Sequence, residues 1–387
     1  MGSLVHLTAC PDYSQPQVTA RVRECLQAVA PVDLIQPGTR VLLKPNVIND
    51  QPPDRAVCTH PEVVRAVAEW ALERGGEVTI GDQPGYALTE EALGAFSNTG
   101  MIEACAGLNV RFRLLSRGGY DAVQPERTFR LKIIEFARDA LQADVIINLP
   151  KAKTHGQTVY SGAIKNMFGA ISPRQRIDVH LVGKFWALSE AIVDCYAARP
   201  PQLHLMDAVT VMEGMGPTQG NPRHLGVIVA STDGVALDRV TQQLMGFAPG
   251  EVATTIAAHN LGLGESDLAQ IEVTGATVAD LAITVEQSPV MRAEHLGPLL
   301  PLLRYVLSAR PKVVKKDCRA CGACKGICPA GAVVIEDYAI VDTQKCVECF
   351  CCQEACPFDA IQVQRPLLYR TLWRLKRGLD SLKARKK

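Results

Sequence analysis

The chain has 387 residues, of which 47% are hydrophobic and 21% charged, with a formal net charge of +1 at pH 7. This composition is ordinary for a soluble protein with a sizeable core. No apolar run reaches the roughly 18 residues of a membrane span. The segment Leu7–Cys10 resembles a lipoprotein cleavage site but lacks a basic and apolar leader, so we reject a signal sequence. Six scattered cysteines show no pairing pattern, so we expect a reducing, cytoplasmic compartment: Cys10, Cys25, Cys58, Cys105, Cys195 and Cys351.

The first three quarters of the sequence alternate short apolar runs with helical patterns, from Thr39 to about Val285. The apolar runs are mostly continuous, as in strands that are buried on both faces of a parallel sheet. The predicted strands are Arg40–Leu43, Glu77–Ile80, Val110–Leu115, Val145–Asn148, Leu203–Met206 and Gly226–Ala230, and the predicted helices are Pro61–Arg74, Thr89–Cys105, Leu131–Gln142, Lys184–Ala197 and Ala236–Gly246. The alternation predicts an α/β domain over residues 1–290, with a mainly parallel sheet and flanking helices.

Polar side chains follow several of these strands at the point where each strand ends. Ligands bind beyond the carboxyl ends of the strands in an open parallel sheet, so we expect these side chains to surround one crevice. The candidate catalytic residues are Lys44, Asn46, Lys151, Lys153, His155, Lys165, Asn166 and Glu213, with Asp82 and Asp207 at two further strand ends. A single lysine at a strand end is usually a solvated loop residue, and only the recurrence at several loops supports a site.

Several ammonium groups around one crevice suit a carboxylate or phosphate substrate. In this interpretation the lysines bind the anion, the asparagines orient it, and His155 or Glu213 moves protons. His155 could equally be a hydrogen-bonded structural histidine. No G-x-G-x-x-G or P-loop motif is present, so the sequence gives no support for nicotinamide or ATP binding.

The pattern changes after residue 290. A Pro-broken, apolar and then basic stretch over residues 291–311 predicts a linker, and eight cysteines follow in two matching runs. The runs are Cys318, Cys321, Cys324 and Cys328 with Pro329, and Cys346, Cys349, Cys352 and Cys356 with Pro357. This is the spacing of bacterial ferredoxins with two [4Fe–4S] clusters. It predicts a small α+β ferredoxin domain over residues 312–365.

In that spacing the fourth cysteine of each run ligates the other cluster. We therefore assign Cys318, Cys321, Cys324 and Cys356 to one [4Fe–4S] cluster, and Cys346, Cys349, Cys352 and Cys328 to the second. The alternatives are two zinc sites or a disulfide framework. Four-cysteine zinc sites usually combine two widely spaced C-x-x-C units, which is not the pattern here.

The last segment, residues 366–387, predicts a basic amphipathic helix. Five leucines from Leu368 to Leu382 are spaced 4, 3, 4 and 3 residues apart, which forms one helical stripe. The stripe either packs on the protein itself or contacts a membrane surface or an acidic partner. Nucleic acid is not an expected partner, because one basic tail is no recognised binding module.

Several segments together resemble a known family. They are KPNV (Lys44–Val47), THPEVVRAVAEWALERGG (Thr59–Gly76), DVIINLPKAKTHGQTVYSGAIKNMFGAI (Asp144–Ile171) and MDAVTVMEGMGPTQG (Met206–Gly220). With GDQPG and ASTDGVALDRV, they resemble the family called Domain of Unknown Function 362 over roughly Val5 to Leu261. The resemblance implies an iron–sulfur-associated protein that often carries a ferredoxin domain, and it implies no particular reaction.

These observations lead to two functional hypotheses. In the first, the chain is an oxidoreductase that receives electrons from a donor protein, passes them through two [4Fe–4S] clusters and reduces an anionic substrate or cofactor bound in the α/β domain. In the second, it is a non-enzymatic electron-transfer or cluster-handling partner of another enzyme, and the basic tail serves for docking. Hydrolysis without redox chemistry ranks last, because it would leave the cysteine runs without a role beyond structure.

Overall fold

The computed structural model describes residues 2–85, 93–183, 185–288 and 309–364. The chain divides into two compact units, Met1–Ser288 and Pro289–Lys387. The expected tail helix and all but the last three residues (309–311) of the expected linker lie outside the described residues. None of the helices within the described ranges has the length and apolar character needed to cross a bilayer.

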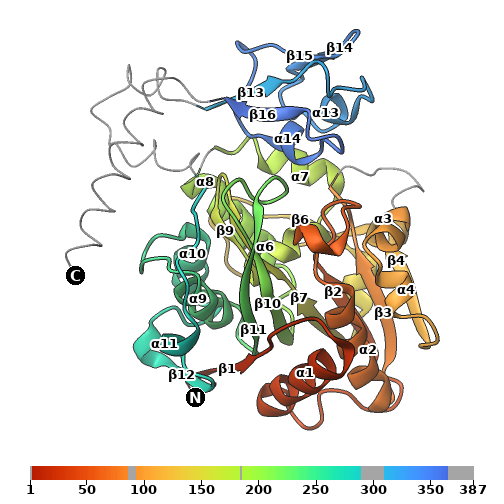
Figure 1. Cartoon of the computed structure of the whole chain (residues 1–387), viewed down its shortest axis with the longest axis vertical. Helices are drawn as coiled ribbons and strands as arrows, with labels where there is room; N and C mark the ends of the chain where they lie inside the picture. Colours follow the sequence, from red (N-terminus) through yellow and green to blue (C-terminus); the bar gives the residue numbers. More distant parts are fainter. Residues whose placement is uncertain (1, 86–92, 184, 289–308, 365–387) are drawn as a thin grey trace. The chain divides into compact units, whose positions relative to one another are not determined.

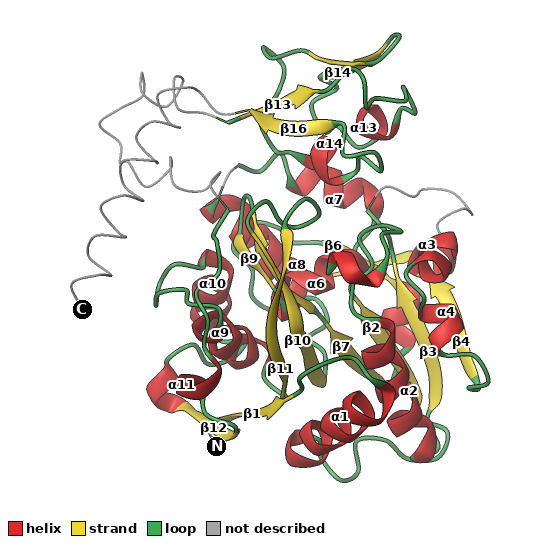
Figure 2. Ribbon diagram, viewed as in Figure 1, coloured by secondary structure: helices red, strands yellow, loops and turns green. Residues whose placement is uncertain are grey.

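One mixed sheet forms the centre of unit 1 (Figures 1 and 2). Its described strands follow the order β12-β1-β11-β10-β7-β2-β3-β4, and β8 extends it by pairing with β10 and β9. Strands β10, β7, β2, β3 and β4 are parallel to one another along this row, whereas β11 is antiparallel to both β10 and β1. The bounds are β1 Ser3–Ala9, β2 Arg40–Pro45, β3 Glu77–Asp82, β4 Val110–Leu114, β7 Val145–Leu149, β8 Lys151–His155, β9 Val159–Ser161, β10 Leu203–Glu213, β11 Asn221–Ser231 and β12 Ile271–Gly275. The predicted α/β class with a mainly parallel sheet is confirmed.

Helices cover both faces of this sheet. Successive side chains of a strand point to opposite faces, and along β2 Val41 and Leu43 pack into one hydrophobic cluster while Leu42 packs into the other. The first cluster includes side chains of α1 (Gln15–Val29), α2 (Pro61–Glu73), α3 (Leu93–Asn98) and α4 (Met101–Ala104). The second includes side chains of α5 (Arg138–Gln142), α6 (Ala163–Asn166), α7 (Pro173–Val179), α8 (Trp186–Ala197), α9 (Gly234–Leu244) and α10 (Ala253–Asn260). Burial on both faces explains why the central strands are continuous apolar runs.

Two predicted helices are wrong in detail. The segment Leu131–Gln142 contains strand β6 (Ile134–Ala137), which pairs with β5 (Tyr120–Val123), and only its end forms a helix, α5. In β6 the side chains of Ile134 and Phe136 are buried and that of Glu135 is exposed, which is the period of two of a strand. The segment Thr89–Cys105 contains α3 and α4 as separate helices, because Gly100 takes a φ of 75° between them.

Unit 2 is built from two similar halves (Figure 1). Each half has a strand, a cysteine run, a single helical turn and a second strand. The first half contains β13 (Arg310–Val313), α13 (Ala323–Gly326) and β14 (Val333–Ile335), and the second contains β15 (Ala339–Val341), α14 (Cys351–Glu354) and β16 (Ile361–Gln364). Both strand pairs join one half to the other, since β13 pairs with β16 and β14 pairs with β15.

The short helix α6 is held in place by a buried carboxylate of α9. Asp238 accepts hydrogen bonds from the backbone N–H groups of Ala163 (2.6 Å) and Ile164 (3.0 Å), and burial raises its pKa to about 7. Gly162 precedes this turn, and a Cβ there would lie 2.2 Å from Oδ1 of Asp238 and 2.4 Å from the Tyr160 hydroxyl. The contact matters for the site because α6 carries Lys165 and Asn166.

We predict that Gly162→Ala lowers the free energy of unfolding by about 1–3 kcal/mol, because the added methyl group has no room beside Asp238. The control is Gly94→Ala in α3, where a Cβ would meet no atom within 4 Å. That change should be neutral or stabilise by up to about 1 kcal/mol. Urea unfolding of both variants measures the difference, and equal stabilities would contradict the tight packing at Gly162.

Candidate functional site

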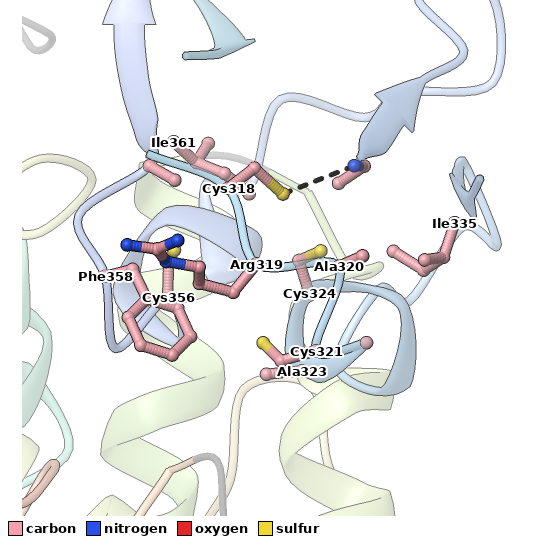
Figure 3. Close-up of a pocket in the computed structure, with 13 residues that line it drawn as sticks. Cys318, Arg319, Ala320, Cys321, Ala323, Cys324, Ile335, Cys356, Phe358 and Ile361 are labelled. Atoms are coloured by element: carbon pink, nitrogen blue, oxygen red, sulfur yellow. Dashed lines mark hydrogen bonds between the residues drawn. The ribbon is translucent and has the colours of Figure 1, made fainter. Parts of the chain in front are cut away.

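Four cysteines of unit 2 line one pocket (Figure 3). They are Cys318, Cys321 and Cys324 of the first run and Cys356 of the second. Burial, together with the thiols of Cys356, Cys321 and Cys318, raises the pKa of Cys324 to about 11. The first run therefore shares its pocket with a cysteine from the other half of the unit.

The remaining cysteines form the corresponding second group. Burial, with the thiols of Cys349, Cys346, Cys324 and Cys328, raises the pKa of Cys352. Its neighbours thus include two cysteines of the first run, Cys324 and Cys328. The exchange of the fourth cysteine between the runs follows from the strand pairing, because each pair joins the two halves.

The backbone around the cysteines repeats every 28 residues, the interval from Cys318 to Cys346. Left-handed φ values occur at matched positions of the two halves: Ala320 and Glu348, Gly322 and Phe350, and Gly331 and Asp359. Turns that alternate left- and right-handed residues point backbone N–H groups into concave sites for anions, including iron–sulfur clusters. Three such N–H groups donate to cysteine sulfurs: Ala332 to Cys328 (3.2 Å), Ala339 to Cys318 (3.4 Å) and Glu348 to Cys346 (3.4 Å).

No three His, Cys, Asp or Glu side chains within the described ranges are placed to hold a single metal ion. Neither the cysteines of unit 2 nor His155, Asp82 and Glu213 of unit 1 form such a group. The donor set in unit 2 is instead four sulfurs spread around a pocket that is also lined by apolar residues such as Ile335 and Ile361.

In unit 1, the lysine that ends β2 is paired with the aspartate that ends the neighbouring strand β3. Lys44 is fully buried, and its Nζ lies 2.6 Å from Oδ1 of Asp82. The second oxygen of Asp82 accepts a hydrogen bond from the backbone N–H of Val47 at 2.7 Å. Burial lowers the pKa of Lys44, and Asp82 opposes that shift. Gly169 allows the close packing here, since a Cβ would lie 2.5 Å from Asp82 Oδ1.

A second buried ion pair lies between β8 and β10. Lys151 Nζ donates to Oδ2 of Asp207 and to the hydroxyl of Tyr13, at 2.8 Å each. Tyr13 donates to the other carboxylate oxygen of Asp207 at 2.7 Å, and its ring stacks on that of His60 with 3.6 Å between centroids. Burial lowers the pKa of His60 to about 4, which keeps this stacked imidazole neutral near pH 7.

A directed chain of hydrogen bonds joins the third lysine to the interior. Lys153 donates to Asn46 Oδ1 (2.5 Å), Asn46 to Asn166 Oδ1 (3.0 Å), and Asn166 to Asn148 Oδ1 (2.7 Å). The amide of Asn148 then lies 3.1 Å from Nδ1 of His204. Each amide accepts a hydrogen bond through its oxygen on the Lys153 side and donates one through its nitrogen on the His204 side. All bonds of the chain therefore run in the same direction and strengthen one another. The order fixes Nδ1 of His204 as the acceptor and places its proton on Nε2.

His155, the last residue of β8, accepts two backbone hydrogen bonds at Nδ1, from Gln157 (3.0 Å) and Thr158 (3.2 Å). Burial lowers its pKa far below the usual range, and the charge of Lys165 on α6 acts in the same direction. His155 is therefore neutral with its proton on Nε2. Glu213 is separate from these contacts, because its carboxylate accepts the backbone N–H of Glu286 at 3.0 Å.

The structure thus brings together most of the predicted residues. At the carboxyl ends of the central strands, Lys44, Lys151, Lys153 and Asn166 lie in buried polar contacts and half-buried Asn46 joins them. His155 and Lys165 interact beside them. Sequence reasoning placed Asp82 and Asp207 at strand ends but not as the partners of two lysines. It missed Tyr13, which reaches the site from a distant segment, and His204, whose place within the predicted strand Leu203–Met206 was the available signal.

We predict that Lys44→Met destabilises the protein by about 3–5 kcal/mol, because it leaves Asp82 buried without its counter-charge. The double variant Lys44→Met with Asp82→Asn should recover a large part of this loss, since it removes both charges. A double-mutant cycle from urea unfolding gives the coupling. Additive effects of the two substitutions would contradict a buried pair.

Two known proteins are similar to this chain. The chain is 33% identical to a thylakoid-associated protein of Synechocystis sp. over 266 residues, which are 68% of this chain and 81% of that protein. The lactate racemase apoprotein of Thermoanaerobacterium thermosaccharolyticum aligns in three dimensions with a TM-score of 0.38 and 11% identity, over 60% of this chain and about half (54%) of its own. A sequence model of the family described as Domain of unknown function (DUF362) matches residues 41–243, the segment that carries all three buried lysines, and this chain belongs to that family.

Proposed function

We propose that this chain is an iron–sulfur oxidoreductase. Unit 2 would hold two [4Fe–4S] clusters, and unit 1 would bind an anionic substrate. The observation that carries the proposal is the pocket lined by Cys318, Cys321, Cys324 and Cys356. It joins three cysteines of one run with the last cysteine of the other, which is the ligand set expected from the spacing.

The residues around the pocket fit this cofactor. All eight cysteines are free thiols, and the N–H groups of Ala332, Ala339 and Glu348 donate to three of their sulfurs. Bound there, the clusters would supply one-electron transfer. The N–H groups stabilise negative charge on the sulfurs, and the apolar wall limits access of water, both of which set a reduction potential.

In unit 1, the chain's own groups would bind the substrate and donate hydrogen bonds to it. Lys153 and Lys165 supply positive charge, Asn46 and Asn166 are held in one orientation by the hydrogen-bond chain, and neutral His155 carries a proton on Nε2. The Nε2–H of a neutral imidazole can donate a hydrogen bond to a substrate oxygen that gains negative charge on reduction. An electron-donor protein is the partner that this function requires.

The rival function, an electron carrier without a substrate, is favoured by one observation. Lys44 and Lys151, two of the four lysines expected to bind an anion, are already paired with Asp82 and Asp207. Thylakoid association of the Synechocystis relative is compatible with either function and supports a peripheral membrane contact by the basic tail.

The first test is the metal content of protein purified without oxygen. We predict about eight iron and eight sulfide per chain. Cys356→Ser, Cys321→Ser and their double variant should each lose about half of the iron, because both residues belong to one group. Combining Cys321→Ser with Cys346→Ser should lose nearly all of it.

The matched control is Cys105→Ser, a buried cysteine of unit 1. This variant should keep about eight iron. Zinc in place of iron would refute the cofactor, and loss of all iron in the double variant Cys321→Ser with Cys356→Ser would refute the grouping.

A second experiment separates enzyme from carrier. Chemically reduced protein is mixed with a panel of small carboxylates and phosphates, and its reoxidation is followed by absorbance. We predict that at least one compound reoxidises the wild type and that His155→Ala slows this step about 100-fold or more, with iron content unchanged. Reoxidation by cytochrome c is the control and should be unaffected. If the wild type and His155→Ala are reoxidised by cytochrome c alone, and at the same rate, the chain is a carrier.

A further inference from the structure

Helix α7 places an arginine with an unused donor beside the polar edge of the sheet. Nη1 of Arg176 donates to the backbone oxygen of Gln83 at 3.0 Å. Its Nε is buried and has no hydrogen-bond acceptor among the described residues. A guanidinium group keeps its proton under all ordinary conditions. A buried N–H of a charged group without an acceptor is costly, which indicates that something outside the chain satisfies it.

Tyr120, the first residue of β5, presents a second unused donor. Its hydroxyl is also buried without a partner among the described residues. The Tyr120 side chain packs on the hydrophobic cluster that contains Phe168, Ile171 and Val179. Val179 is the last residue of α7, three positions after Arg176. Tyr120 also pairs with Ala137 of β6, and β6 contacts Ile171 and Ser172 immediately before α7, so the tyrosine and the arginine helix lie on neighbouring segments.

The surrounding charges favour an anion between these two donors. Burial lowers the pKa of Arg176, whereas Tyr120 and Asp82 raise it, so both groups act on the guanidinium. Burial also raises the pKa of Tyr120 to about 12, which keeps its hydroxyl protonated and able to donate. The carboxylate of Asp82 is already held by Lys44 at 2.6 Å. Both donors thus lack an oxygen acceptor, and a negatively charged one would also offset the charge of the guanidinium.

We propose that Arg176 and Tyr120 form a subsite for the oxyanion group, a carboxylate or a phosphate, of a small ligand. The Arg176 Nε–H and the Tyr120 O–H donate to its oxygens, and the hydrogen bond to Gln83 holds the guanidinium in place. Both residues are half-buried as a whole, while the two donor atoms themselves are buried. The inference rests on the proposed anionic substrate and identifies residues that would bind its charged end.

The test is calorimetric titration of the purified full chain with malonate and, separately, with inorganic phosphate. We expect the wild type to bind at least one of them, and the one that binds identifies the class of oxyanion. Arg176→Gln should weaken binding at least tenfold, because it removes a charged hydrogen bond. Tyr120→Phe should weaken it about three- to tenfold.

The matched control is Arg174→Gln, an exposed arginine on the same helix, which should bind as the wild type does. Tyr120→Phe removes a single oxygen and carries the test alone if Arg176→Gln fails to fold. Binding of neither probe by the wild type, or equal binding by the Tyr120→Phe and Arg174→Gln variants, would overturn the subsite. The iron content of the same samples is measured as well. It separates failure of the subsite from failure of the proposed cofactor, because either can be present without the other.

Discussion

The need to neutralise buried lysine charge is the constraint on which the arrangement of unit 1 depends. Lys44, Lys151 and Lys153 are each at most 1% exposed. An ammonium group in such a place loses its proton or destabilises the fold unless oxygen atoms surround it. Asp82 and Asp207 supply these oxygens for two of the lysines, and Asn46 with the backbone of Val57 does so for the third. The neutralising groups thus come from different strands and loops, so the fold and the site are specified together.

This dependence explains which parts of unit 1 the sequence could predict. The apolar runs of β2, β3 and β7 gave correct strands because their burial is visible in composition alone. Strand β8 was predicted as a loop, since Lys151, Lys153 and His155 would normally face solvent. All five of its residues are buried, and Lys151 is compensated by Asp207, 56 residues away, and by Tyr13, 138 residues away. Pairs at that separation leave no local pattern.

Unit 2 shows the opposite case. The spacing of the cysteines is local, and it predicted a grouping in which Cys356 joins the first run, as the pocket has it. The two halves of unit 2 repeat the same backbone conformations around their cysteines. These include left-handed φ values at Glu348 and Phe350, where glycine would be expected. Such conformations are costly for these residue types and persist when surrounding structure requires them. The spacing predicted the cysteine positions, whereas these strained residues had no sequence signal.

The pairing of the lysines also decides where an anion can bind. A ligand that approached Lys44 or Lys151 would compete with a carboxylate fixed within 2.8 Å, and displacing it would leave that carboxylate buried and uncompensated. The same ligand at Arg176 would displace nothing, because Nε has no acceptor among the described residues. The buried pairs therefore set the shape and rigidity of the sheet edge, while positive charge outside those pairs remains for recognition. This division of roles could not be read from the sequence, in which all of these cations look equivalent.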